Sequence, residues 1–128
     1  MSSSPSEDRC ETIHVLLVDD EESFRVNLAS MLRDDGHPVV DYPSAEAALS
    51  AGLSDVSVLV TDYSMPGASG VALADRLHEV RPRTPVVVVS AYRTETIETQ
   101  AQRRPWVTLR SKPLDYDDLH ALIHRLLA

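Results

Sequence analysis

The stretch VSVLVTD at residues 56–62 is a short, valine-rich run that ends in the carboxylate of Asp62. A short run rich in valine, bounded by a polar residue, is typical of a strand. After a loop, Ser69 can cap a helix in which apolar residues recur at helical spacing as far as Leu77. This stretch therefore predicts one strand followed by one helix.

The same strand-and-helix unit recurs on both sides of this stretch. We expect the other strands at residues 13–18, 39–42, 86–89 and 106–109, and the other helices near residues 24–32, 44–52, 94–102 and 115–127. Repeated units with short connections predict an α/β domain with a doubly wound parallel sheet and helices on both faces. The weak strand at 39–42 should lie at an edge, and the polar helix at 94–102 should have low local stability.

Length and composition are those of a single folded domain of 128 residues. Twelve basic and twenty acidic residues give a formal net charge of −8, which argues against direct nucleic-acid binding. The chain has neither a secretory signal nor an apolar run near the ~18 residues of a membrane span. We expect a flexible leader at residues 1–11, a domain at residues 12–128, and a cytoplasmic location, since Cys10 is the one cysteine.

Polar and ionisable residues follow four of the predicted strands at the points where these strands end. They are Asp19, Asp20, Asp62, Ser90 and Lys112. Open α/β sheets bind ligands outside the carboxyl ends of their strands, so these residues should meet at one edge. Three crowded carboxylates repel one another unless a cation shares the site, and a site of oxygen ligands favours Mg²⁺. We therefore expect a Mg²⁺ site formed by the three aspartates.

The same residues are suited to phosphoryl transfer. Asp62 can attack a phosphoryl group and form an aspartyl-phosphate, while Ser90 supplies a hydroxyl donor and Lys112 a compact positive charge. Lys112 is the single lysine beside eleven arginines. Loops are polar for backbone reasons alone, so any one of these residues could be ordinary. The occurrence of acids, a hydroxyl and an amine together at the carboxyl ends of the strands favours a functional site over ordinary loop residues.

Four motifs carry a family resemblance: DDE at 19–21, DYSMPGASG at 62–70, SA at 90–91 and KP at 112–113. In order and spacing they resemble the receiver domain of bacterial two-component response regulators over residues 12–128. The resemblance implies a flavodoxin-like fold with five strands in the order 2-1-3-4-5.

The resemblance also implies roles for individual residues. Asp62 is expected to be the phosphoacceptor, with Mg²⁺ held by Asp19, Asp20, Asp62 and the backbone carbonyl of Ser64. Ser90 and Lys112 are expected to contact the phosphoryl group, and the peptide bond between Lys112 and Pro113 is expected to be cis.

A receiver is a signalling switch and not an enzyme with a multiple-turnover substrate. The resemblance implies a sensor histidine kinase or a histidine phosphotransfer protein as the phosphoryl donor. The added charge would alter the face formed by the fourth helix and the fifth strand. That face, with the fifth helix, would bind a downstream protein, an effector domain in a longer chain, or a second copy in a homodimer.

Two positions bear on how such a switch would work here. Receivers often carry an aromatic residue three positions before the lysine, and this chain has Leu109 there. Tyr92 could cover the mouth of the site instead, and we expect Ser64 and Tyr92 to tune the lifetime of the phosphoryl group. A group of arginines near the fourth helix and fifth strand is either a partner surface or an ordinary solvated one: Arg93, Arg103, Arg104 and Arg110.

Two other functions stay open from the sequence. A phosphatase of the haloacid dehalogenase type would also use an aspartate nucleophile, but that family places it after the first strand in an Asp-x-Asp motif. An interaction module that is never phosphorylated is the other alternative, and the full set of site residues weakens it. His120 and His124 have a spacing that zinc ligands can have, but with no third ligand nearby we expect a solvated helix edge.

Overall fold

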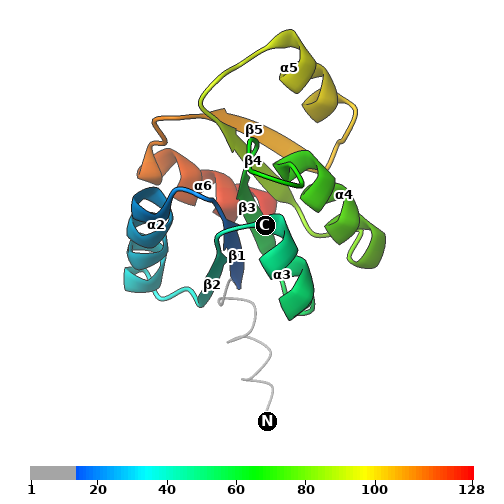
Figure 1. Ribbon diagram of the computed structural model, residues 1–128. Helices are drawn as coiled ribbons and strands as arrows, with labels where there is room; N and C mark the ends of the chain where they lie inside the picture. The colour runs from blue at the N-terminus through cyan, green and yellow to red at the C-terminus, as the bar shows by residue number, and fades with distance from the viewer. Residues whose placement is uncertain (1–13) are drawn as a thin grey trace.

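The structure, a computed structural model, describes residues 14–128 and contains one five-stranded parallel sheet in the order β2-β1-β3-β4-β5 (Figure 1). The strands are β1 (Val15–Val18), β2 (Val39–Tyr42), β3 (Val58–Asp62), β4 (Val86–Ser90) and β5 (Val107–Ser111). The helices are α2 (Glu22–Asp34), α3 (Ala45–Ala51), α4 (Gly70–Val80), α5 (Glu95–Gln102) and α6 (Tyr116–Leu126). The expected doubly wound fold and the edge position of β2 are confirmed. The predicted leader, with Cys10, lies outside the described residues.

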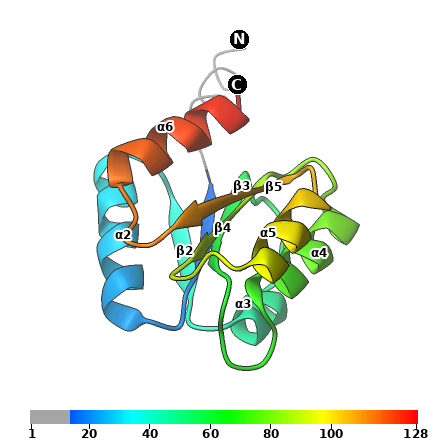
Figure 2. The ribbon, with the colours of Figure 1, turned by 90° about the horizontal axis from the view of Figure 1, so that it is seen from above.

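Two helical layers enclose the sheet, with α2 and α6 on one face and α3, α4 and α5 on the other (Figure 2). Successive side chains of a strand point to opposite faces, so Val15 and Leu17 pack toward the first layer while Leu16 and Val18 pack toward the second. Every residue of β3 and β4 is buried. Burial on both faces explains why these two strands appear in the sequence as continuous apolar runs.

Side-chain caps begin four of the helices. Ser44, Ser69 and Thr94 each accept a hydrogen bond from a backbone amide in the first turn of α3, α4 and α5. Asp115 does the same for α6, where it accepts from the amide of Asp118. The carboxylate of Asp118 pairs with Arg110 instead of returning to the amide of Asp115, so the cap forms without the reciprocal bond of a capping box.

The structure shifts some of the expected boundaries. β3 begins at Val58 and includes Asp62, and β5 extends to Ser111, so that Lys112 follows the end of its strand directly. α5 buries only Ile97, as its polar sequence predicts. Within residues 14–128, no helix has the length and apolar character needed to cross a membrane.

Candidate functional site

The carboxyl ends of four strands converge at one edge of the sheet. Asp62 and Ser90 are the last residues of β3 and β4, Asp19 follows β1, and Lys112 follows β5. The backbone amide of Lys112 donates to the carbonyl of Ser90 over 2.9 Å, which fixes the chain leaving β5 beside the end of β4. Parallel strand order therefore brings together residues that lie far apart in the sequence.

The three predicted acids form one pocket. Carboxylate oxygens of Asp19, Asp20 and Asp62 lie within 4.8 Å of one another. Asp19 is 1% exposed and Asp62 is 8% exposed, whereas Asp20 faces solvent. One oxygen of Asp19 accepts a hydrogen bond of 2.8 Å from the amide of Glu21, which orients this carboxylate. An all-oxygen pocket with one solvent-facing side is suited to a hard divalent cation.

The ammonium of Lys112 joins two of these acids. Its Nζ lies 3.1 Å from Oδ2 of Asp19 and 3.4 Å from Oδ1 of Asp62. It also lies 4.4 Å from the centre of the Phe24 ring, whose face attracts a cation. One side chain thus contacts both buried carboxylates.

Negative charge in this pocket is only partly compensated. Burial and the neighbouring carboxylate of Asp19 raise the pKa of Asp62 to about 6, although Lys112 opposes the rise. Burial disfavours the charged form of Lys112, yet its hydrogen bond to Asp19 and the charges of both acids leave its pKa above the usual value. A divalent cation would relieve the repulsion among the carboxylates.

The structure does not direct the hydroxyl of Ser90 toward Asp62. Ser90 Oγ donates to the carbonyl oxygen of Tyr92 over 2.5 Å and accepts from the amide of Tyr92 over 3.1 Å. The Tyr92 side chain is 75% exposed, and the described contacts do not place it over the pocket. The hydroxyl therefore belongs to a local turn in this state of the protein.

The loop between β3 and α4 depends on residues that the sequence analysis missed. Glu46 of α3 accepts a hydrogen bond of 3.0 Å from the amide of Ala68. Tyr63 donates from its hydroxyl to Gln100 of α5 over 2.7 Å, so the residue directly after Asp62 is connected to α5. Gly70 lies so close to the backbone of Asp62 that a side chain would overlap it. A glycine directly after a capping serine, where alanine would favour the helix, was the available signal for this close approach.

Most of the candidate arginine surface is occupied by contacts within the chain. Arg93 pairs with Glu98, and Arg110 pairs with Asp118. Arg104 pairs with Asp75 of α4, and its hydrogen bond holds the pKa of that carboxyl below the usual value. Arg103 is exposed. Leu109 packs, partly buried, against the core beneath α3 and α4.

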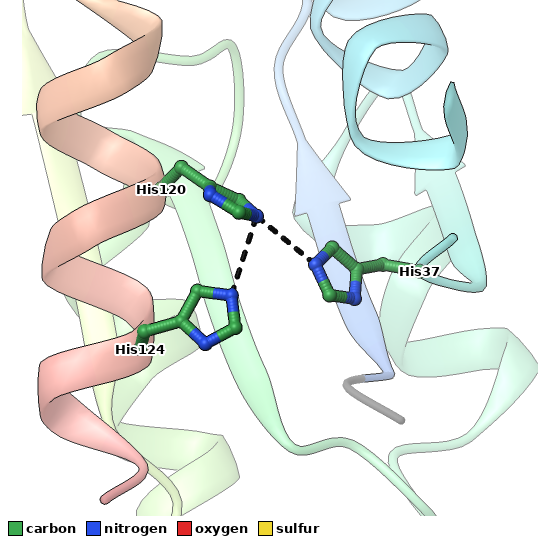
Figure 3. A group of neighbouring side chains, drawn as sticks. All are labelled: His37, His120 and His124. Atoms are coloured by element: carbon green, nitrogen blue, oxygen red, sulfur yellow. Dashed lines mark hydrogen bonds between the residues drawn. The ribbon is translucent and has the colours of Figure 1, made fainter. Parts of the chain in front are cut away.

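The expectation for His120 and His124 was wrong in one respect. A third imidazole, that of His37, lies beside them (Figure 3). This contact could not be predicted from the sequence, because His37 precedes an edge strand and lies 83 positions from His120.

Comparison with known proteins identifies the family. Residues 15–124 match the model described as response regulator receiver domain. The transcriptional regulatory protein FixJ of Rhizobium meliloti (strain 1021) is 38% identical over an alignment of 106 residues, and the match covers 81% of this chain and 50% of FixJ. The chain thus spans about half the length of this relative.

Solved structures agree with this match. The receiver domain of the hybrid histidine kinase CckA superimposes with a TM-score of 0.75 and 27% identity, over 90% of this chain and 99% of that one. A CheY-like receiver domain protein from Methanospirillum hungatei JF-1 shares the fold, with a TM-score of 0.83 and 20% identity over 91% of this chain and 94% of that one. Since the matched residues take in the acidic pocket and its lysine, the chain belongs to the response regulator receiver domain family.

Proposed function

We propose that this receiver is a phosphorylation-controlled switch in which Asp62 accepts a phosphoryl group. The observation that carries the proposal is the position of Lys112, whose ammonium contacts Asp62 and Asp19 together at the carboxyl edge of the sheet. A cation at this distance can leave the carboxylate and bind the oxygens of a transferred phosphoryl group.

We propose Mg²⁺ as the cation of the acidic pocket. The pocket offers oxygen ligands only, and its three carboxylates gather around the single ammonium of Lys112, so their negative charge exceeds the positive charge beside it. Asp19, Asp20 and Asp62 would hold the ion together with the backbone carbonyl of Ser64, which is assigned by family resemblance. When bound, Mg²⁺ supplies positive charge that offsets the negative charge of the incoming phosphoryl oxygens.

The chain's own residues perform the transfer. A carboxylate oxygen of Asp62 forms a bond to phosphorus while the phosphorus–nitrogen bond of a phosphohistidine donor breaks. The electron pair of that bond stays on the departing imidazole, which takes up a proton. Lys112 then exchanges its contact with Asp62 for a phosphoryl oxygen. The hydroxyl of Ser90 rotates away from Tyr92 to donate to another oxygen, and this rotation frees the turn at residues 90–92.

The response is transmitted to α5. Tyr63 links the residue after Asp62 to Gln100, and Arg104 holds α5 to Asp75 of α4. Because α5 buries only Ile97, these polar contacts account for much of what fixes its position. We propose that phosphorylation shifts α5 and β5, which then bind a downstream protein, an effector domain in a longer chain or, with α6, a second copy.

The proposal places the protein in the cytoplasm, with a histidine kinase or a phosphotransfer protein as its donor. We propose that the protein has no substrate that it turns over many times. A phosphatase is the second candidate, because the aspartate and the acidic pocket would suit its chemistry as well. An unphosphorylated module is the third.

One labelling experiment separates the three functions. The protein is incubated with Mg²⁺ and a small acyl phosphate, and the adduct is measured by intact mass. We expect one phosphoryl group per chain, no adduct with Asp62→Asn, and a normal adduct with Asp55→Asn, which neutralises an exposed acid in a turn where asparagine is tolerated. Sustained release of phosphate over many equivalents would support the phosphatase instead, and no adduct would support the module.

Lys112→Arg tests the role of the lysine. The guanidinium of arginine is larger than the ammonium of lysine and is hydrated differently. The variant should therefore accept a phosphoryl group on Asp62 but fail to transmit the response to α5. Hydrogen exchange of α5 before and after labelling measures the response. An unchanged response in Lys112→Arg would remove the lysine from the switch.

A further inference from the structure

Three imidazoles from distant parts of the chain meet on the face of the domain covered by α2 and α6 (Figure 3). His37 lies in the connection between α2 and β2, and His120 and His124 lie one turn apart on α6. Nε2 of His120 is 3.1 Å from Nε2 of His37 and 3.3 Å from Nε2 of His124. His37 comes just before the amino-terminal end of β2, whereas Asp62 lies at the carboxyl end of β3. The histidine cluster therefore lies toward the amino-terminal ends of the strands, and the acidic pocket lies at their carboxyl ends.

Hydrogen bonding within the cluster cannot satisfy all three rings. Each neutral imidazole nitrogen carries either one proton or one lone pair. Nε2 of His120 contacts two other Nε2 atoms, so it can be properly matched with only one of them. His37 is 7% exposed, and its Nδ1 is buried without a hydrogen-bond partner among the described residues. The contact with Nε2 of His120 is therefore the one polar contact described for the buried ring of His37, and it competes with the contact between His120 and His124.

A metal ion would satisfy the three nitrogens at once. Zinc–nitrogen bonds of about 2.0–2.1 Å in a tetrahedral arrangement separate the ligand nitrogens by about 3.3–3.4 Å. The two contacts of 3.1 and 3.3 Å lie near that separation. The three ligand nitrogens all lie within 4.8 Å of one another, so a small rotation of one ring completes the triangle.

The surroundings of the cluster suit a metal as well. Burial and the two neighbouring rings lower the pKa of His37, which favours the neutral imidazole that binds metals. His124 is exposed, so an ion can enter from solvent. Oδ2 of Asp35 lies 3.7 Å from Nε2 of His120, where it could supply a fourth ligand in place of water.

We propose that His37, His120 and His124 form a binding site for a divalent transition metal that prefers imidazole ligands, with Zn²⁺ as the probe. Imidazole nitrogens suit Zn²⁺, Ni²⁺ and Cu²⁺, whereas Mg²⁺ prefers the oxygen ligands of the acidic pocket. The bound ion would fasten α6 to the connection between α2 and β2. The site shares no residue with the acidic pocket that contains Asp62.

Zinc affinity is measured by competition with a chromophoric chelator, in a large excess of Mg²⁺ that occupies the acidic pocket. We expect one Zn²⁺ per chain. His124→Gln should weaken binding by at least about tenfold, because one metal–nitrogen bond is lost. This variant changes an exposed side chain and should fold normally. His37→Gln should weaken binding as well, but it alters a buried residue and is the second test.

Two control variants exclude other zinc ligands. His14→Gln removes an exposed histidine outside the cluster, and Cys10→Ser removes the single thiol. Both should keep the wild-type affinity. Thermal unfolding gives an independent measurement, since Zn²⁺ should raise the melting temperature of the wild type and His14→Gln but not of His124→Gln. Zinc binding that is absent under excess Mg²⁺, unchanged in His124→Gln, or lost in either control would overturn the proposal.

Discussion

Gly70→Ala tests how closely α4 must approach the phosphoacceptor. Alanine stabilises the interior of a helix by up to about 1 kcal/mol relative to glycine. At position 70, however, a Cβ would lie 3.0 Å from the carbonyl carbon of Asp62 and would overlap its carbonyl oxygen. Ordinary carbon contacts begin near 3.5 Å, so the two backbones must separate by something on the order of 1 Å. We expect the clash to outweigh the gain in helix propensity.

The size of the expected loss of stability follows from the rigidity of the two backbone segments that clash. Forced overpacking costs about 1–3 kcal/mol, and the upper part of this range applies because the atoms that clash belong to backbone. After the gain in propensity is subtracted, Gly70→Ala should lower the free energy of unfolding by about 2 kcal/mol. For a domain of this size, that is a fall of about 8 °C in melting temperature.

The same displacement should slow phosphorylation. The carbonyl in question belongs to Asp62, so moving it moves the nucleophile. A misplacement of about 1 Å can cost up to about 100-fold in rate. Denaturant unfolding and the initial rate of labelling by an acyl phosphate with Mg²⁺ measure the two effects separately.

Ala72→Gly is the matched control. Ala72 is exposed in the first turn of the same helix, and its amide still donates to Ser69 in the variant. It should lose about 1 kcal/mol through propensity alone and keep the labelling rate of the wild type. If Gly70→Ala were as stable as the wild type, or were labelled equally fast, the close approach would not constrain the site.

Three further predictions concern stability and are measured by denaturant unfolding. Asp75→Asn should lose less than about 1 kcal/mol, because the ion pair with Arg104 is partly exposed. Since Arg104 lowers the pKa of Asp75, this contribution should be full above the ordinary value of 3.8 and should disappear as the pH falls well below it; a difference that persisted in acid would contradict the assignment. Leu59→Ala, in a fully buried position, should cost about 2–5 kcal/mol, and a smaller loss would mean that the core can collapse around the cavity. Ser44→Ala removes the cap of α3 and should cost about 1 kcal/mol, whereas Ser44→Asp should retain most of the stability.

The fold could be predicted because strand and helix alternate with clear periods. Burial on both faces made β3 and β4 visible as apolar runs, and the rule that parallel sheets bind ligands at their carboxyl edge selected Asp19, Asp62 and Lys112 without any coordinates. These residues occupy strand ends, so their neighbours follow from topology. The predicted boundaries of β3 and β5 were less accurate, because polar residues at the end of a strand can still take part in the hydrogen-bond ladder of the sheet.

Contacts between side chains could not be predicted in the same way. Ser90 can hydrogen-bond either to its own turn or across the pocket, and only the structure shows which. The contact of Glu46 with Ala68 joins the first turn of α3 to the loop between β3 and α4, and no sequence period specifies how these two segments lie relative to one another. The meeting of His37 with His120 depends on how α6 packs beside the edge strand, which is a matter of tertiary packing.

The position of Lys112 gives this protein a built-in spectroscopic reporter. It supplies the one lysine ammonium among 128 residues, so isotopic labelling of lysine would yield a single side-chain signal. That signal comes from a group between two carboxylates and beside the ring of Phe24, whose ring current is sensitive to small displacements. Metal loading, phosphoryl transfer and the return to the resting state could each be followed at this one resonance, in the unaltered sequence.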